Sequence, residues 1–555
     1  MRLTTIIEQV HRHVVERPDD VFLNLRRSGR EKAVTFSDLW SGAQSYAAAL
    51  ERSGASKSSV CIIMLEHGED LYFAFLGAML YGAIPAFMPF CTPKQDPVLF
   101  WDNHQKLFAR IDVGVLITFD TNRDLALQAL GGDRPLILQS EVVPLASEAD
   151  WPENARPASS DVAFLQHSSG TTGLKKGVML SHDAVMAQLE AYTPTIGFDR
   201  DCVIVSWLPV YHDMGLIACL VMPMVIGATV VHLDPFEWVS APLTLLDAVQ
   251  ERRGTHMWMP NFAFNHLVGN RRKNEIWDLS SLRVISNCSE PCRIESMSRF
   301  AEVFSGSGVS PATPQVCYAM AETVFAISQT ELGSAVQPLR VSREGLIEDH
   351  RMKVPTSPDD ERVLASCGRP IADMKVRIDI GDGLNADEGQ VGEICVTGPS
   401  LYTGYYKLPD VTADKLRGGW HYTGDLGFLW EGQIYVTGRR DDLMIVRGRN
   451  FYSHDIEAVI NEVPGVHPGR TVTFTIENAN LGTAEAVALV EPAEGADLAD
   501  LRRRLRAAVE DASGLVLGRV KFVTRGSLTK TTSGKISRET NRKRFLEDQL
   551  STLEF

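Results

Sequence analysis

Short apolar strands alternate with amphipathic helices from residue 35 to residue 90, and this alternation constrains the fold more than any other feature of the sequence. Apolar residues at helical spacing predict helices over Phe36–Ser53 and Glu69–Tyr81, and apolar runs predict strands over Val60–Met64 and 83–88. Strands that alternate with helices in this way build a parallel sheet. Because 555 residues exceed one hydrophobic core, we expect about three or four domain-sized units.

Two uncharged runs, 72–93 and 214–231, are long enough to be considered as membrane spans. Gly82 and Pro85 interrupt the first run, and Pro223 and Gly227 interrupt the second, so neither can continue as one straight helix. The first 20 residues carry charges every few positions, unlike a signal peptide. We therefore expect a cytoplasmic protein with no integral membrane association.

Charge and cysteine content exclude further classes of function. The chain carries 55 Lys and Arg against 70 Asp and Glu, a formal net charge of −15, whereas a sequence-independent nucleic-acid binder normally has a basic excess. No nucleic-acid partner is expected. Among nine cysteines only Cys288 and Cys292 are close in sequence, and they lack a second ligand pair for zinc. The cysteines indicate buried thiols in a reducing compartment.

A hydroxyl- and glycine-rich stretch lies between two apolar runs, from Leu165 to Ser181. Glycines let backbone N–H groups turn toward an anion, hydroxyls can donate to phosphoryl oxygens, and a lysine adds positive charge. The P-loop of ordinary NTPases is excluded, because Lys175 stands where its second glycine must be. The stretch is either a solvated loop or a phosphate-binding loop. In the second case its binding residues are Ser168, Ser169, Gly170, Thr171, Thr172, Gly173 and Lys176.

Functional side chains follow the strands predicted at 203–208, Val284–Asn287 and 315–317. Doubly wound sheets bind ligands at such carboxyl ends of strands. After the third strand a tyrosine can stack on a purine, a carboxylate can hold Mg²⁺ on phosphate oxygens, and a hydroxyl can donate to the same phosphate. Each residue alone could be an ordinary strand-end residue. The candidates are His212, Ser289, Glu290, Pro291, Tyr318, Ala319, Met320, Glu322 and Thr323.

A carboxylate and an arginine follow later in the chain. Asp425 stands in the string Tyr-Thr-Gly-Asp-Leu-Gly, and Arg439 stands in Gly-Arg-Arg-Asp, after a predicted turn at 430–432 and a strand. Asp425 can accept both hydroxyls of a ribose, and Arg439 can donate to ribose or phosphate. Either could be a paired surface charge, but their joint occurrence after the phosphate loop favours a nucleoside site.

Beyond Asp442 the chain restarts as a small α/β unit, with strands predicted at 471–475 and 486–490 and a helix at 498–512. It ends in Leu-Thr-Lys-Thr-Thr-Ser-Gly-Lys-Ile-Ser-Arg, where Lys535 lies on a Ser/Gly-containing loop. A lysine there can stabilise charge as an acyl oxygen attacks phosphorus. The alternative is a basic tail with no specific ligand.

These motifs stand in the order found in the acyl-adenylate-forming (ANL) superfamily, which the chain resembles from Phe36 to Arg538. Two positions depart from the usual pattern: Lys175 replaces a proline, and Ala319 replaces a glycine and narrows the adenine slot. The resemblance implies an α/β fold with a large N-terminal multi-subdomain adenylate-forming domain, residues 1–440. A small mobile C-terminal α+β domain, residues 441–555, would pivot at Asp441.

Within the superfamily the chain most resembles the fatty acyl-AMP ligases. The spacing of the motifs fits this resemblance, since 43 residues separate Glu322 from Ser366 and acyl-CoA synthetases usually have a shorter segment there. The polar segment 342–362 is either the insertion of these ligases or an unremarkable surface loop. Strings similar to those of the ligases begin at Trp207, Pro260, Ser366 and Arg447.

The resemblance implies that ATP and a fatty or other uncharged-tail acid form acyl-AMP and pyrophosphate, and that the acyl group then passes to the thiol of a holo acyl carrier protein. Binding and charge stabilisation would do most of the catalysis. The resemblance also implies a role for each candidate residue. The loop from Ser168 to Lys176 would hold the leaving phosphates, Glu322 would hold Mg²⁺, and Thr323 would contact the α-phosphate. Tyr318 would contact the adenine, Asp425 and Arg439 the ribose, and Lys535 the phosphorus and oxygen atoms that react, while His212 would lie where the nucleotide and acyl pockets meet.

The string from Trp207 to Gly215 lacks the superfamily's amino-acid signature, which favours an acid with an uncharged tail. Met214, Trp258 and Phe262 are candidate walls of the acyl pocket or plain core residues. Three alternatives remain: an acyl-CoA synthetase with the same first step, a non-catalytic acyl or nucleotide sensor, and a membrane-inserted acyl-handling protein. Intact Lys535 and Glu322 argue against the sensor.

Overall fold

The alternating helices and strands near the N-terminus form a four-stranded parallel sheet in the order β4-β3-β5-β6. A computed structural model of the protein describes residues 5–91, 97–146, 151, 156–167, 176–272, 275–446, 449–478, 483–530 and 536–553. All five residues of β3 are buried, as expected of a strand covered on both faces. The predicted bounds of α2, α3 and β3 are confirmed. The elements are α2 (Phe36–Ser53), β3 (Val60–Met64), α3 (Glu69–Tyr81), β4 (Ile84–Phe87), α4 (Pro97–Ile111), β5 (Val113–Thr118), α5 (Arg123–Leu130) and β6 (Leu136–Leu138).

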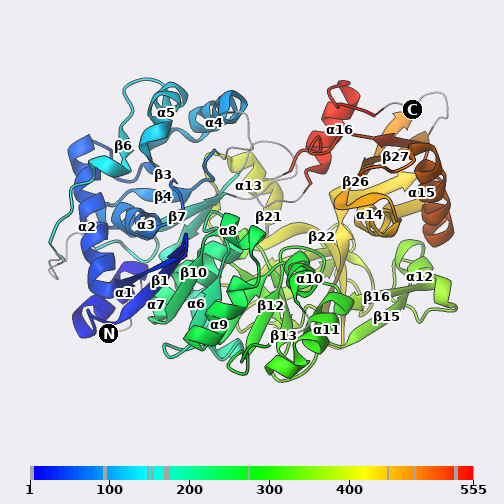
Figure 1. Cartoon of the computed structure of the whole chain (residues 1–555), viewed down its shortest axis with the longest axis horizontal. Coiled ribbons are helices and arrows are strands. Elements are labelled where there is room, and N and C mark those ends of the chain that lie inside the picture. Colours follow the sequence, from blue (N-terminus) through cyan, green and yellow to red (C-terminus); the bar gives the residue numbers. More distant parts are fainter. Residues whose placement is uncertain are drawn as a thin grey trace.

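A nine-stranded sheet lies below this one in Figure 1, in the order β17-β14-β13-β12-β11-β9-β10-β1-β2. Its six strands from β13 to β1 are parallel to their neighbours, whereas β14, β17 and β2 are antiparallel edges. The functional side chains predicted after β9, β12 and β13 therefore lie at the carboxyl ends of parallel strands of one sheet, in which β12 and β13 are neighbours and β11 separates β12 from β9. Its elements are α1 (Ile6–Glu16), β1 (Val21–Arg27), β2 (Arg30–Thr35), β9 (Val203–Ser206), β10 (Thr229–Leu233), α8 (Pro235–Ser240), α9 (Thr244–Arg252), β11 (His256–Met259), α10 (Asn261–Asn270), β12 (Val284–Asn287), α11 (Ile294–Val303), β13 (Pro314–Ala319), β14 (Ala326–Gln329) and β17 (Arg369–Pro370).

The second uncharged run does not form one helix. A π-helix, Met214–Val221, leads into α7, Met222–Ile226, which ends at Gly227 with a left-handed φ of 84°. The chain then enters β10. The predicted interruption at Gly227 is thus confirmed, whereas Pro223 does not break the helix, because it lies in the first turn of α7, where a proline is tolerated. The described residues contain no helix that is both long and apolar enough to cross a membrane.

The strands that flank the predicted phosphate loop pair with each other in antiparallel register. β7 (Val162–His167) and β8 (Gly177–Ser181) form a small sheet, and β20 (Gly404–Tyr405) adds to β8. Ser181 caps the following helix α6, His182–Thr195, by accepting from the N–H of Ala184 at 3.2 Å.

A five-stranded antiparallel sheet contains Asp425 and Arg439, the two residues predicted to bind the ribose. The strands β22 (Trp420–Trp430) and β23 (Gln433–Arg439) form a hairpin in which Asp425 lies opposite Arg439. Two residues 14 positions apart in sequence thus become cross-strand neighbours. The other elements are β18 (Lys375–Asp379), β19 (Gly392–Thr397), α13 (Pro409–Lys415) and β21 (Leu416–Arg417).

The polar segment predicted as an insertion or surface loop begins and ends in paired strands. β15 (Pro338–Ser342) and β16 (Glu361–Ala365) are antiparallel, and α12 (Arg343–Ile347) follows β15. Val341 and Leu364 pack with Phe428 and Tyr435 of the hairpin formed by β22 and β23 in a small separate core. Arg362 then reaches the C-terminal part, where it pairs with Asp455 at 3.3 Å.

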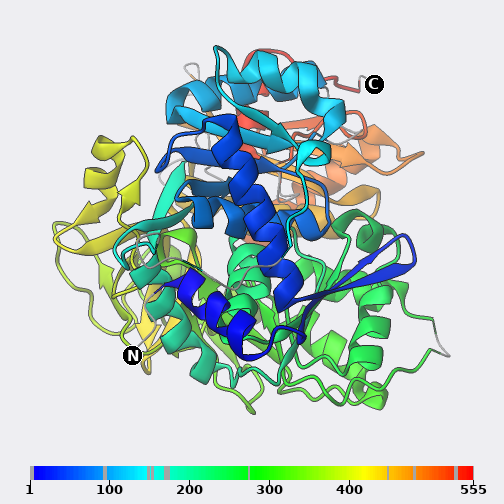
Figure 2. The ribbon, with the colours of Figure 1, turned by 90° about the vertical axis from the view of Figure 1, so that its left-hand side faces the viewer.

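The C-terminal part is a small α/β unit at the upper right of Figure 1, behind the blue N-terminal helices in Figure 2. Its sheet has the order β26-β27-β28 and is covered on one face by α14 and α15 and on the other by α16. The strands and helix predicted at 471–475, 486–490 and 498–512 are confirmed as parts of longer elements. The bounds are β24 (Leu443–Val446), β25 (Arg449–Tyr452), α14 (Ser453–Glu462), β26 (Val466–Asn478), β27 (Thr483–Pro492), α15 (Leu498–Ser513), β28 (Arg519–Phe522) and α16 (Arg538–Leu546).

Candidate active site

Asp425 is held between Tyr318 and Arg439. The phenol of Tyr318 donates to Oδ2 at 2.6 Å, and Nε of Arg439 donates to Oδ1 at 2.9 Å. The Asp425 side chain is 8% exposed, whereas that of Arg439 is 52% exposed. The negative charge of Asp425 raises the pKa of Arg439, and burial followed by the same charge raises the pKa of Tyr318. The arrangement fixes an anion at the end of β13, where it can accept hydrogen bonds from a diol.

Glu322 lies on the short 3₁₀ turn Ala321–Thr323, directly after β13. Its Oε1 accepts from the phenol of Tyr405 at 2.7 Å, and the Nζ of Lys176 lies 5.3 Å from the centre of the same tyrosine ring. The pairing of β20 with β8 places Tyr405 here. The structure therefore joins the lysine of the predicted phosphate loop to the predicted metal ligand through a tyrosine that the sequence analysis did not single out.

His421 is a second residue that sequence reasoning missed. It is buried on β22, and its Nδ1 lies 3.2 Å from the phenol oxygen of Tyr402. Burial lowers its pKa, while the charges of Glu322 and Asp425 oppose that shift. His421 lies on the same strand as Asp425, and its partner Tyr402 packs against Tyr405, the partner of Glu322, so the imidazole lies between the two halves of the candidate site. A lone histidine before Tyr422 carried no signal in the sequence.

Four predicted nucleotide contacts have well-defined neighbours. Thr323 is fully buried, and its hydroxyl donates to the carbonyls of Met320 and Phe325. Ala319 ends β13, and the Met320 N–H donates to the Phe325 carbonyl at 2.9 Å. A carboxylate oxygen of Glu290 accepts from the N–H of Phe262 at 2.6 Å. Contacts of these residues with a nucleotide remain predictions.

The remaining strand-end residues lie on turns. Ser289 precedes Pro291 and has a left-handed φ of 71°, which turns the chain sharply after β12. His212 is half-buried beside Tyr211, with ring centres 4.9 Å apart, and it lies two residues before the start of the π-helix. Both positions border the same edge of the sheet as Tyr318.

The predicted acyl-pocket residues divide between two faces of the sheet. Met214 is buried, and its Sδ lies 3.0 Å from the Sγ of Cys288. Trp258 is also buried, and its Nε1 donates to the phenol of Tyr192 on α6 at 3.0 Å. Phe262 is 45% exposed and packs against Trp207 and Trp238 at the start of α10. Met214 and Trp258 lie together on the α6 side, and Phe262 does not.

The C-terminal motif is anchored next to the predicted hinge. Asp441 is exposed on the 3₁₀ turn Arg440–Asp442. Its neighbour Asp442 forms an ion pair with Arg538, whose other guanidinium nitrogen donates to Glu457 at 2.8 Å. A bridge between Lys530 and Ile536 closes the base of the terminal loop. The predicted phosphate-loop residues Ser168, Ser169, Gly170, Thr171, Thr172 and Gly173, and the predicted catalytic Lys535, lie outside the described residues.

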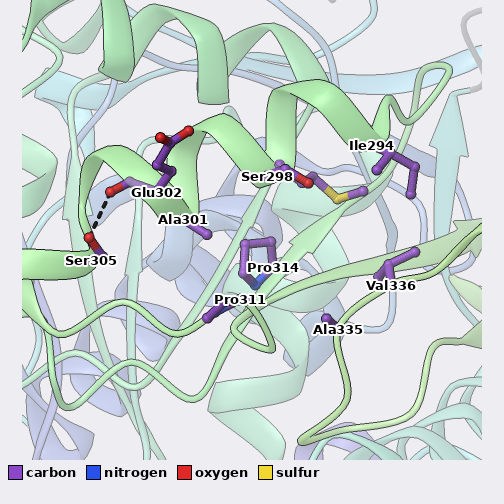
Figure 3. Close-up of a pocket in the computed structure, with 10 residues that line it drawn as sticks. Ile294, Ser298, Ala301, Glu302, Ser305, Pro311, Pro314, Ala335 and Val336 are labelled. Carbon is purple, nitrogen blue, oxygen red and sulfur yellow. Dashed lines mark hydrogen bonds between the residues drawn. The ribbon is translucent and has the colours of Figure 1, made fainter.

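A separate surface groove of 390 Å³ runs along α11. Figure 3 shows that Ile294, Ala301, Pro314 and Val336 face it, with Ser305 donating to the carbonyl of Glu302 at one end. None of its lining residues belongs to the predicted site.

Three comparisons place these features among known proteins. The sequence model of the family described as AMP-binding enzyme matches residues 10–406. The medium-chain-fatty-acid–[acyl-carrier-protein] ligase JamA of Moorena producens (strain JHB) is 29% identical, over 94% of this chain and 91% of that protein. A putative acyl-CoA synthetase of Caulobacter vibrioides (strain NA1000 / CB15N) is 31% identical, over 93% and 91%.

The fold is also similar to solved structures. A structure from a study of fatty acyl-adenylate ligases from E. coli and L. pneumophila superimposes with a TM-score of 0.89 and 26% sequence identity. The similarity covers 98% of each chain. The shared fold therefore extends over both parts of the molecule.

Proposed function

Because the chain belongs to the AMP-binding enzyme family, we propose that it activates a fatty carboxylic acid as acyl-AMP and passes the acyl group to the phosphopantetheine thiol of an acyl carrier protein. The α/β fold and the superfamily predicted from the sequence are confirmed by this membership. The observation that carries the proposal is Asp425 between Tyr318 and Arg439, an arrangement suited to a nucleoside.

In the first step an oxygen of the carboxylate attacks the α-phosphorus of ATP, and the bond to the β-phosphate oxygen breaks as pyrophosphate leaves. In the second step the carrier's thiol attacks the acyl carbonyl, loses its proton, and releases AMP. Asp425 and Arg439 would hold the ribose while Tyr318 borders the adenine. Fixing the nucleotide in this way removes most of the entropic cost of the attack.

Charge stabilisation on the phosphates would come from the phosphate loop and the terminal loop. Lys176 lies over the ring of Tyr405, close to Glu322, where the leaving phosphates would lie. Lys535 would approach the α-phosphate from the C-terminal part, and Thr323 would lie on the opposite side. His212 would border both the nucleotide and the acid.

Glu322 fits a magnesium site of the kind used with ATP. Mg²⁺ in such sites is held by one or two carboxylates together with substrate phosphates, and Glu322 offers one carboxylate oriented by the Tyr405 phenol. The ion would neutralise phosphate charge as pyrophosphate forms. Tyr405→Phe should therefore raise the Mg²⁺ concentration needed for half-maximal rate, since it removes the bond that orients Glu322.

Transfer requires the two parts of the chain to change their relative orientation. We place the boundary at Asp441, with residues 1–440 forming the adenylation domain and 441–555 the mobile domain that carries Lys535. The exposed turn at 440–442 supports this division. All nine cysteines are free thiols, which suits the cytoplasmic location that we also propose.

The test has two arms. Purified enzyme with ATP and Mg²⁺ should exchange radiolabelled pyrophosphate into ATP only when a fatty acid is present. The same mixture should then form a thioester with a holo carrier protein, detected by mass spectrometry. No carboxylate-dependent exchange with any acid would refute the proposal.

An acyl-CoA synthetase is the second candidate, favoured by the 31% identity to the putative acyl-CoA synthetase of Caulobacter. CoA recognition needs a cationic surface for its 3′-phosphate, whereas a carrier presents its arm through protein contacts. Efficient acyl-CoA formation at ordinary CoA concentrations, with little transfer to the carrier, would select this candidate and leave the adenylation step intact.

A further inference from the structure

A hydrogen-bonded cluster surrounds the phenol of Tyr192, deep between α6 and the nine-stranded sheet. The phenol accepts from Nε1 of Trp258 at 3.0 Å and donates to Oε1 of Gln329 at 3.1 Å. It also lies 3.9 Å from the Sγ of Cys317. Tyr192 and Trp258 are each 1% exposed. Two large aromatic rings are thus fixed by directional bonds instead of packing alone.

This cluster lies on the sheet face that Met214 borders close to the predicted site residue His212. Side chains alternate between faces along a strand, so Ser286 and Cys288 of the β12 segment share the face of Trp258, with which Ser286 is in register. Asn287 points to the opposite face, where its amide donates to Asn261 of α10 at 3.0 Å. Cys317 of β13 points to the face of the cluster, whereas the next residue, Tyr318, points to the opposite face and donates to Asp425.

Met214 lies nearer the reaction centre on the same face. Its Sδ contacts the Sγ of Cys288, and it follows His212 by two residues. Methionine is flexible and adapts to ligands of different shape. Trp258 cannot yield in the same way, because moving it would leave its N–H and the Tyr192 phenol without their bond in a buried place.

We infer that the Tyr192–Trp258 pair closes the far end of the acyl pocket and limits this enzyme to short acids, while Met214 swings aside to admit them. This inference rests on the proposed function. Cys288 contacts Met214 on one side, and Cys317 lies 3.9 Å from the Tyr192 phenol on the other, so the two thiols connect Met214 with the Tyr192 cluster. A long alkyl chain on this face would meet the fixed aromatic pair.

The test is a chain-length series in carboxylate-dependent pyrophosphate exchange, from butanoate to hexadecanoate. We expect kcat/KM to be highest for acids up to about octanoate and to fall by roughly tenfold or more for dodecanoate, because an apolar pocket that is too short excludes the longer chain sterically. Trp258→Leu should raise the dodecanoate-to-hexanoate ratio by roughly tenfold or more. Tyr192→Phe removes the bond that holds Trp258 but keeps the ring, so its ratio should rise by less than that of Trp258→Leu. Trp277→Leu is the matched control, because Trp277 is also a buried tryptophan whose Nε1 donates to a side chain, here Asp247 at 2.7 Å, and its ratio should stay within about threefold of the wild type.

The outcomes separate this inference from the proposed function. Wild-type enzyme that activates hexadecanoate as well as hexanoate would overturn the closed end. Exchange with no acid of any length would refute the proposed function instead. If Trp258→Leu does not fold, as judged by thermal unfolding, Trp258→Phe removes less volume and should shift the ratio in the same direction. An unchanged ratio in a folded Trp258 variant contradicts the inference.

Discussion

The carboxylate of Asp425 illustrates how single residues in this protein depend on the charges around them. Each of its oxygens already accepts one bond, from Tyr318 and from Arg439, so its position is fixed before any ligand arrives. A preorganised acceptor loses less entropy when it binds a diol than a mobile one does. Two predictions at the residue scale follow from this kind of positioning.

Asp425→Asn should lower kcat/KM for ATP by roughly tenfold to a hundredfold, because it replaces charge-assisted hydrogen bonds worth about 1.5–3 kcal/mol with neutral ones. Initial rates of acyl-AMP formation at varied ATP concentration measure the effect. Asp379→Asn is the control, since Asp379 is another buried carboxylate that contacts a tyrosine and an arginine, namely Tyr422 and Arg377. A loss of equal size in both variants would contradict a nucleoside role for Asp425.

Lys535→Ala should abolish most adenylate formation while leaving ATP binding nearly intact, because the lysine is proposed to act on charge that develops only during the attack. Removing such a donor costs on the order of several kcal/mol. Exchange rates report the first effect and equilibrium dialysis with ATP reports the second. Lys543→Ala, on the exposed side of α16, should change neither. Near-normal acyl-AMP synthesis by Lys535→Ala would remove the residue from the mechanism.

At the scale of elements, the turn 440–442 connects the hairpin formed by β22 and β23 to the C-terminal part. The carboxylate of Asp442 pairs with Arg538, which begins α16 beyond the terminal loop. Glu457 on α14 binds the same guanidinium and is itself buried, which raises its pKa against the opposing effect of Arg538. The predicted hinge turn, the start of α16 and α14 are therefore tied together through one guanidinium.

Asp441→Pro should slow transfer to the carrier and spare acyl-AMP formation, because proline fixes φ and hinders rotation about the turn. Single-turnover assays of the two steps, run separately, measure this. Asp441→Ala keeps φ free and should leave both rates within about threefold of the wild type. Equal slowing of both steps in the proline variant would argue against a hinge at this position.

At the scale of the whole molecule, several histidines are buried without charge in the N-terminal part. Burial is the largest cause that lowers the pKa of His13, His182 and His256 from 6.5 to about 4. His256 is held between the carbonyl of Ile196 and the hydroxyl of Thr255. Between pH 6.5 and 4 the unfolded chain therefore binds more protons than the folded one.

The free energy of unfolding should accordingly fall as the pH drops from 7.5 to 5. Each pKa unit of difference between folded and unfolded states is worth about 1.4 kcal/mol once the pH lies below both values, and the loss is only partial at pH 5. Urea unfolding at the two pH values measures the change. His256→Gln should reduce this dependence, because glutamine does not titrate. A midpoint equal at both pH values would show that these imidazoles do not control acid stability.

Local chemistry determined much of this protein. Helix and strand periodicity fixed the bounds of α2, β3, α3 and β12, because hydrophobic spacing and caps act within a few residues. The order of the motifs identified the superfamily. The string Tyr-Thr-Gly-Asp and its partner Gly-Arg-Arg-Asp predicted that Asp425 and Arg439 act together, and they lie opposite each other in one hairpin.

Tertiary structure alone decided which distant segments complete the candidate site. Tyr405 reaches Glu322 because β20 pairs with β8, and the neighbouring contact from Thr403 to Met179 spans 224 residues of sequence. The burial of His421, and the bond between Trp258 and Tyr192, likewise depend on elements that meet only in the folded chain. No local pattern encodes such contacts, because the partners of a strand or helix face are chosen by the packing of the whole sheet and the burial that it brings.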